Sequence, residues 1–141
     1  MKRLRALLLV LPLLFSLNAC LYNSGDETQA EQLVKQWHDA FKAKNWDAAF
    51  ALYDKSFYND HPRDAWLTEL KSLGDTYGAL KDIRPVFHQK NARLRGDYYI
   101  YGFHLIFEKG SAAETITVFK ALESDKLTIA GHMIQPKGHQ G

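Results

Sequence analysis

The first half of the chain carries apolar residues at the spacing of helix faces. Residues 28–31 have the spacing of a helix-capping box. Behind it, apolar residues recur every three or four positions along one stripe, which consists of Ala30, Leu33, Val34, Trp37, Ala40 and Phe41. A shorter stripe occupies residues 46–53, and a third helix is expected after Pro62, with Gly74 as its stop. The pattern therefore predicts three helices.

The second half alternates apolar and polar residues, which is typical of strands buried on one face. Three dipeptides suited to two-residue hairpin turns interrupt it, namely Gly96-Asp97, Gly110-Ser111 and Ser124-Asp125. Turns at these places fix the strand register by counting. The first pairs would be Arg95 with Tyr98, Lys109 with Ala112, and Glu123 with Lys126. The sequence therefore predicts a meander of four antiparallel strands.

This register sorts the strand residues into two faces. The inward face collects the largest apolar side chains: Val86, His88, Ala92, Leu94, Tyr99, Tyr101, Phe103, Leu105, Phe107, Ile116, Val118, Leu122, Leu127, Ile129 and Met133. The outward face is mixed and collects Ile100, His104, Ile106, Thr115, Thr117, Phe119, Ala121, Thr128, Ala130, His132 and Ile134. A slip of one residue would scatter the large apolar residues over both faces, which supports the meander.

Three segments carry a resemblance to a known family. They are Ala65-Trp66-Leu67 through Tyr77-Gly78, then Tyr101-Gly102-Phe103, and the closing stretch from Leu127 to Ile134. Together the pattern over residues 27–136 resembles small bacterial lipoproteins of NTF2-like (cystatin-like) families. The resemblance implies an α+β cone, in which about three N-terminal helices pack on a curved four-stranded antiparallel sheet around a pocket. The wider superfamily includes isomerases, dehydratases and non-enzymatic modules, so the fold does not decide the function.

The N-terminus has the organisation of an export signal. Lys2, Arg3 and Arg5 precede an apolar run over residues 6–15, which is much shorter than the roughly 20 residues of a membrane-spanning helix. Leu17-Asn18-Ala19-Cys20 resembles the lipobox of bacterial lipoproteins, in which the cysteine carries diacylglycerol. Cys20 is the only cysteine in the chain, so it has no disulfide partner within it.

These features predict a signal peptide over residues 1–19, a lipidated tether over 20–26, a domain over 27–136 and a tail over 137–141. Leu21 stands where an aspartate would resemble an inner-membrane retention signal, so we expect a lipid anchor in the outer membrane, facing the periplasm. Three of the 18 basic residues lie in the predicted leader, and the remaining 15 face 16 acidic residues. This balance argues against a nucleic-acid partner.

The predicted inward face offers little chemistry. Proton-transfer enzymes of this fold generally place a carboxylate or a His–Asp pair inside the cone, where its pKa can be tuned. We find no Asp or Glu on the predicted inward face. His104 and His132 would stand two strands apart, about 10 Å, which is too far for a compact zinc site. The sequence therefore predicts a protein without catalytic residues, metal or cofactor.

Two non-enzymatic functions remain open. The first is contact with another copy of the chain or another envelope protein through the outer sheet face, with the candidates Ile100, His104, Phe119, His132 and Ile134. The alternative is a carrier or sensor for a small apolar ligand, with the pocket candidates Trp37, Tyr53, Trp66, His88 and Tyr101. Aromatic residues of this kind also simply fill the core of a small domain.

Overall fold

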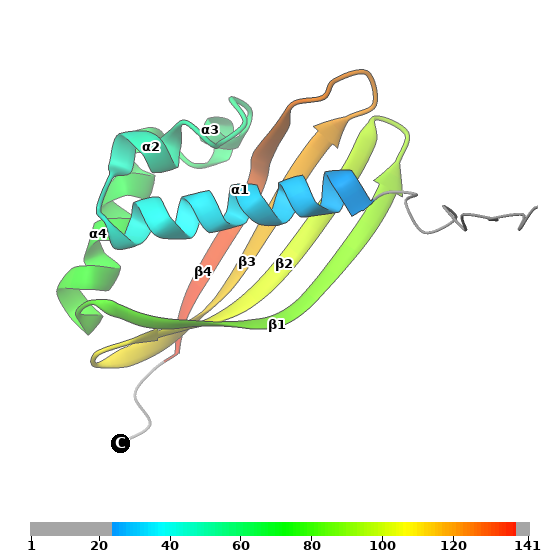
Figure 1. Ribbon diagram of the computed structural model, residues 1–141. Coiled ribbons are helices and arrows are strands. Elements are labelled where there is room, and N and C mark those ends of the chain that lie inside the picture. The colour runs from blue at the N-terminus through cyan, green and yellow to red at the C-terminus, as the bar shows by residue number, and fades with distance from the viewer. Residues whose placement is uncertain (1–23, 138–141) are drawn as a thin grey trace, which may run out of the picture.

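A computed structural model describes residues 24–137 as four helices and one curved, four-stranded antiparallel sheet (Figure 1). The helices are α1 (Ser24–Lys42), α2 (Trp46–Phe50), α3 (Phe57–Asp60) and α4 (Arg63–Tyr77). The strands are β1 (Leu80–Arg93), β2 (Gly96–Phe107), β3 (Gly110–Ala121) and β4 (Leu127–Lys137), and they lie in the order β1-β2-β3-β4. The predicted fold class, helices packed on a curved four-stranded sheet, is confirmed.

Parts of the predicted organisation fall outside the described residues. These are the leader over 1–19, the lipidation site at Cys20, most of the tether, and the tail beyond Lys137. Within residues 24–137, no helix is long and apolar enough to cross a membrane.

The helices follow the apolar stripes closely. The buried face of α1 holds five of the six residues of its predicted stripe, with Leu33 partly buried. Lys44, with φ of 54°, ends the helix in the left-handed region, and the Asn45 side chain then caps α2 by accepting a hydrogen bond from the Ala48 amide at 3.2 Å. Gly74 does not stop α4. The helix continues to Tyr77 and ends at Gly78, with φ of 82°.

The first two hairpin turns lie two residues earlier than predicted. Arg93 pairs with Gly96 and Phe107 pairs with Gly110, so each glycine opens a strand instead of forming the turn. The reason is close packing, because a Cβ on Gly96 would lie 2.1 Å from the Lys120 carbonyl oxygen and one on Gly110 would lie 2.4 Å from the Tyr77 ring. The shift is an even number of residues, so the two faces of β2 and β3 keep their predicted members.

Three residues that are expected to face inward are exposed, two because of the turns and one because of an irregular strand. Leu94 lies in the first turn and is 98% exposed, while Leu122 lies in the loop after β3 and is 75% exposed. That third connection is a five-residue loop, Leu122 to Lys126, and not a two-residue turn. Val86 is 66% exposed because β1 is irregular between Pro85 and Phe87, as expected for a proline that cannot donate to a strand ladder.

A bulge in β4 changes which face its last residues occupy. Val118 pairs with Ile129 but Thr117 pairs with Gly131, so Ala130 is an extra residue. One extra residue reverses the facing of everything after it. His132 and Ile134 are therefore buried inside the fold, and Met133 is 54% exposed. The predicted outward placement of His132 and Ile134, and the predicted inward placement of Met133, are wrong for this reason.

Candidate functional site

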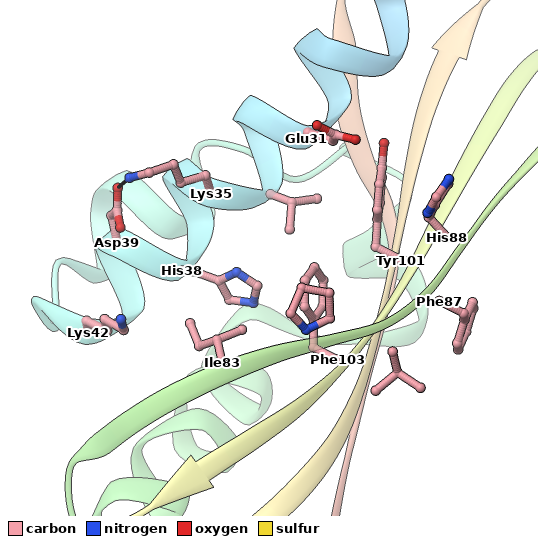
Figure 2. A pocket seen from close by; sticks show the side chains of 13 residues that line it. Glu31, Lys35, His38, Asp39, Lys42, Ile83, Phe87, His88, Tyr101 and Phe103 are labelled. Atoms are coloured by element: carbon pink, nitrogen blue, oxygen red, sulfur yellow. Dashed lines mark hydrogen bonds and ion pairs between the residues drawn. The ribbon is translucent and has the colours of Figure 1, made fainter.

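A cleft of about 640 Å³ lies between α1 and the strands β1 and β2 (Figure 2). Its apolar walls include Val34 from α1 and Ile83, Pro85, Tyr101 and Phe103 from the strands. Charged and polar side chains also line it, and they are Glu31, Lys35, Asp39, Lys42 and His88. The cleft therefore combines an apolar surface with charges of both signs.

His38 connects this cleft to the interior of the fold. Its ring projects from α1 toward Ile83 and Phe103, as Figure 2 shows, and it packs edge-on against Phe103 with ring centroids 4.8 Å apart. The Nε2 atom of His38 lies 2.7 Å from Oε2 of Glu114. Glu114 lies within β3 and is only 2% exposed. A histidine in the wall of the cleft is thus hydrogen-bonded, on its interior side, to a buried carboxylate.

The buried contacts continue beyond Glu114. Its second oxygen, Oε1, lies 2.8 Å from Nε2 of His132, and Nδ1 of His132 lies 2.7 Å from the hydroxyl of Tyr53. That hydroxyl accepts a hydrogen bond from Nε1 of Trp66 at 2.9 Å. Since Trp66 can only donate, Tyr53 has its own proton to give to His132, which then gives its Nε2 proton to Glu114. We call these five side chains the His38–Trp66 network.

The network keeps its carboxylate ionised despite burial. Burial alone would raise the pKa of Glu114, but hydrogen bonds from His132 and His38, together with their charges, lower this pKa to about 2. Burial lowers the pKa of His132 and outweighs the opposing effect of Glu114. Burial also raises the pKa of Tyr53. At neutral pH the interior therefore contains a Glu114 carboxylate and a neutral His132.

His38 is the member of the network that can act on a molecule in the cleft. Its Nδ1 atom has no hydrogen-bond partner within residues 24–137. This atom is not completely buried, so a molecule in the cleft can reach it. A histidine whose other nitrogen is fixed by a carboxylate can accept or donate a proton at the free nitrogen. The site can therefore bind a polar group of a ligand and can also exchange a proton with it.

The prediction that no carboxylate faces inward is wrong. Glu114 lies between Ala112 and Ile116 on the inward face of β3, and the alternation of the strand already places it there. The apolar residues alone do not reveal it, because an acid within an inward-facing series is normally unfavourable unless it is paired. Hydrogen bonds from His38 and His132 compensate the burial of Glu114. His132 faces Glu114 only because of the bulge at Ala130.

The structure separates the five predicted pocket residues into two groups. His88 and Tyr101 line the cleft. Trp37, Tyr53 and Trp66 are at most 6% exposed and belong to the core, where Tyr53 and Trp66 complete the network. His38 was missed because it follows Trp37 at the margin of the apolar stripe, where a histidine carries no distinctive spacing.

The outer sheet face retains three of its five interface candidates. Ile100, His104 and Phe119 are half-buried, and Phe119 packs on Tyr98 with ring centroids 4.8 Å apart. His132 and Ile134 are interior residues. In the part of the chain that the structure describes, no group of three or more His, Cys, Asp or Glu side chains is placed to hold a metal ion.

No protein-family model and no curated protein matches this chain. Among solved structures, Bd1075 from Bdellovibrio bacteriovorus is similar, with a TM-score of 0.57 over 82% of this chain and 16% sequence identity. The present chain spans only 42% of the length of that protein. At this identity the likeness concerns the fold alone.

Proposed function

We propose that this protein is a lipid-anchored envelope protein of the NTF2-like kind that carries or senses a small organic molecule in the cleft between α1 and β1. The cleft itself is the observation that carries the proposal. Its volume of about 640 Å³ falls within the range of roughly 300–1,000 Å³ that is usual for small-molecule sites. It also combines apolar walls with a few polar groups, and such a combination favours binding with a defined orientation.

The lining of the cleft supports a small molecule better than a core that is merely incompletely filled. Tyr101 is 6% exposed and Val34 is 3% exposed, so part of the wall belongs to the packed core, while most residues of β1 and the charged residues of α1 form its exposed rim. His38 contributes a polar nitrogen that has no hydrogen-bond partner among the residues that the structure describes. An empty apolar void needs no such group, whereas a binding site uses one to select its ligand.

The anchor belongs to the same proposal. Helix α1 begins at Ser24, four residues after Cys20 in the sequence, and four residues can span at most about 14 Å. A diacylglycerol group on Cys20 would therefore keep α1 and the cleft close to the membrane surface. Incorporation of labelled palmitate, tested with and without Cys20→Ala, measures this part of the proposal.

Binding of the neutral fluorescent probe N-phenyl-1-naphthylamine to residues 21–141 tests the cleft. This segment contains the whole described fold. We expect saturable 1:1 binding, and we expect Ile83→Trp to fill the cleft and weaken binding by at least about tenfold, or about 1.4 kcal/mol. Ile106→Trp is the matched control, because Ile106 is also half-buried but lies on the outer sheet face.

Equal loss of affinity in both variants would contradict the proposal, as would absence of binding to the unaltered chain. Circular dichroism of each variant establishes that the fold is retained. Only a loss confined to Ile83→Trp supports the cleft.

A second candidate function is contact with a second copy of the chain through the outer sheet face. Met133 favours it, because it is 54% exposed and pairs with Thr115 on the same face as Phe119. Phe87 is 48% exposed and pairs with Gly102 at the edge of the sheet, but it also lines the cleft. The burial of His132 and Ile134 removes part of that predicted surface, so we place the cleft first.

A further inference from the structure

We propose that the molecule bound in the cleft is an organic acid, whose anionic group binds the Nδ1–H of His38 while the protein takes up one proton from solvent. This inference rests on the proposed function and names the class of ligand. It follows from the charge balance of the His38–Trp66 network and from the one nitrogen of that network that opens on the cleft.

The first step concerns the buried charge. Glu114 has both oxygens within 2.8 Å of imidazole nitrogens and a fully buried side chain. A buried carboxylate is costly, and an anion bound next to it would add repulsion unless a proton is taken up with it to compensate the added charge. Within residues 24–137, the groups placed to take that proton are His38 and His132, since these are the two ion-pair partners of Glu114.

The second step identifies which histidine takes the compensating proton. The side chain of His132 is 0% exposed, and its Nδ1 accepts the proton of Tyr53. If Nδ1 of His132 carried a proton, it could no longer accept the hydrogen bond from the Tyr53 hydroxyl. The hydroxyl would then have no acceptor for its own proton, since its contact with Trp66 is one in which Trp66 donates. His38 has no such conflict, because its Nδ1 is free. The extra proton therefore belongs on His38.

The third step concerns what the protonated ring offers. With Glu114 behind it, the pair of side chains is neutral overall, and one N–H donor faces the cleft. A carboxylate, phenolate or sulfonate oxygen can accept a charge-assisted hydrogen bond from this N–H group. Without the proton, the buried charge of Glu114 would repel the same anion. The anion and the proton therefore bind together.

The other charged and titratable groups at the cleft do not substitute for His38. They are Glu31, Lys35, Asp39 and Lys42 of α1, His88 of β1 and Tyr101 of β2. Lys35 and Asp39 form an ion pair at 2.6 Å and cancel, and His88 lies 3.7 Å from Glu27. Lys42 forms no ion pair within the described residues and adds positive charge at the mouth, where solvent screens it.

Two fluorescent probes of similar shape test the inference. 8-Anilinonaphthalene-1-sulfonate is an anion, and N-phenyl-1-naphthylamine is its neutral counterpart. We expect the affinity of residues 21–141 for the anion to rise about tenfold from pH 8 to pH 6, because one linked proton changes affinity by up to about tenfold per pH unit. The neutral probe should show no such change. Calorimetry in buffers of different ionisation enthalpy should record proton uptake with the anion only.

Variants locate the proton. His38→Gln should abolish the pH dependence for the anion and lower its affinity at pH 6 about tenfold, with binding of the neutral probe retained. His88→Gln is the matched control, because His88 lines the same cleft but its side chain is 70% exposed and its ion-pair partner is Glu27, not Glu114. It should leave the pH dependence intact.

Equal pH dependence for both probes would overturn the inference, and so would proton release on binding or an effect of His88→Gln equal to that of His38→Gln. If the neutral probe binds and the anion does not, the proposed function stands and the organic-acid inference fails. If neither probe binds, both fail.

Discussion

At the scale of single residues, the most informative side chain is Glu114. Burial to 2% exposure raises the pKa of a carboxyl group, but hydrogen bonds from two imidazoles hold Glu114 ionised. The alternation of β3 was enough to predict that Glu114 faces inward. Its partners could not be predicted, because one comes from the margin of a helix stripe and the other from beyond a bulge.

The pKa values of this cluster predict how stability depends on pH. The pKa of Glu114 is about 2 in the folded chain, against an ordinary value of 4.5. As the pH falls, Glu114 is therefore protonated in the unfolded chain before it is protonated in the folded chain, and this favours unfolding. Its stabilisation is present above about pH 4.5 and is lost toward pH 2, by about 3 kcal/mol in order of magnitude. The pKa of His132 is also lowered from 6.5, so acidification below about pH 6.5 already favours the unfolded chain.

Urea denaturation of residues 21–141 across this range measures the effect. Glu114→Gln should reduce the loss of stability below pH 4.5, while the earlier loss from His132 persists. A smaller loss should remain, because the fold also lowers the pKa values of Asp39, Asp54, Asp82 and Glu108. Glu69→Gln, at an exposed position of α4, should leave the whole profile unchanged. A Glu114→Gln profile that matches the unaltered chain below pH 4.5 would show that Glu114 is not ionised in the folded state.

At the scale of elements, hydrophobic periodicity predicted α1 and the faces of β2 and β3, because burial of one stripe or one face dominates those elements. It failed where a single residue changes the geometry. The extra Ala130 in β4 and the irregularity at Pro85 in β1 reverse or expose the side chains around them. The turns were misplaced because Gly96 and Gly110 serve close packing against neighbouring segments.

Two glycine substitutions with opposite expected signs test this account of the elements. Gly96→Ala should destabilise the chain by about 1–3 kcal/mol, because its Cβ would meet the Lys120 backbone oxygen at 2.1 Å and its φ is 153°. Gly74→Ala should stabilise it by about 0.5–1 kcal/mol, because Gly74 is helical and a Cβ there meets nothing within 4 Å. Thermal unfolding measures both, and stabilisation by Gly96→Ala would contradict the packing argument.

At the scale of the whole molecule, the resemblance to NTF2-like families predicted helices on a curved sheet and a pocket between them. The fold class is as predicted, with four helices where three were expected, but the place of the cleft was not predictable. It depends on how α1 lies over the sheet and on the course of the long edge strand β1 (Figure 1). Of the five aromatic and histidine residues proposed for the pocket, the three on the helices and their connections proved to be core, because a domain of this size needs large side chains to fill its interior.

The two candidate functions use different surfaces of the same fold. The cleft is lined by α1 and the inward side of β1 and β2, whereas Ile100 and Phe119 lie on the opposite side of the sheet. A ligand in the cleft and a second copy on the outer face would therefore affect separate sets of backbone amides. Nuclear magnetic resonance resolves these amides residue by residue.

The most direct test is a ¹H–¹⁵N titration of residues 21–141 with N-phenyl-1-naphthylamine at constant protein concentration. The account predicts chemical-shift changes that concentrate in residues 31–42, 83–88 and 101–103, with the largest near His38. Changes confined to the outer sheet face, around Ile100 and Phe119, would contradict the assignment of the cleft as the functional site. An unchanged spectrum at saturating probe would contradict it equally.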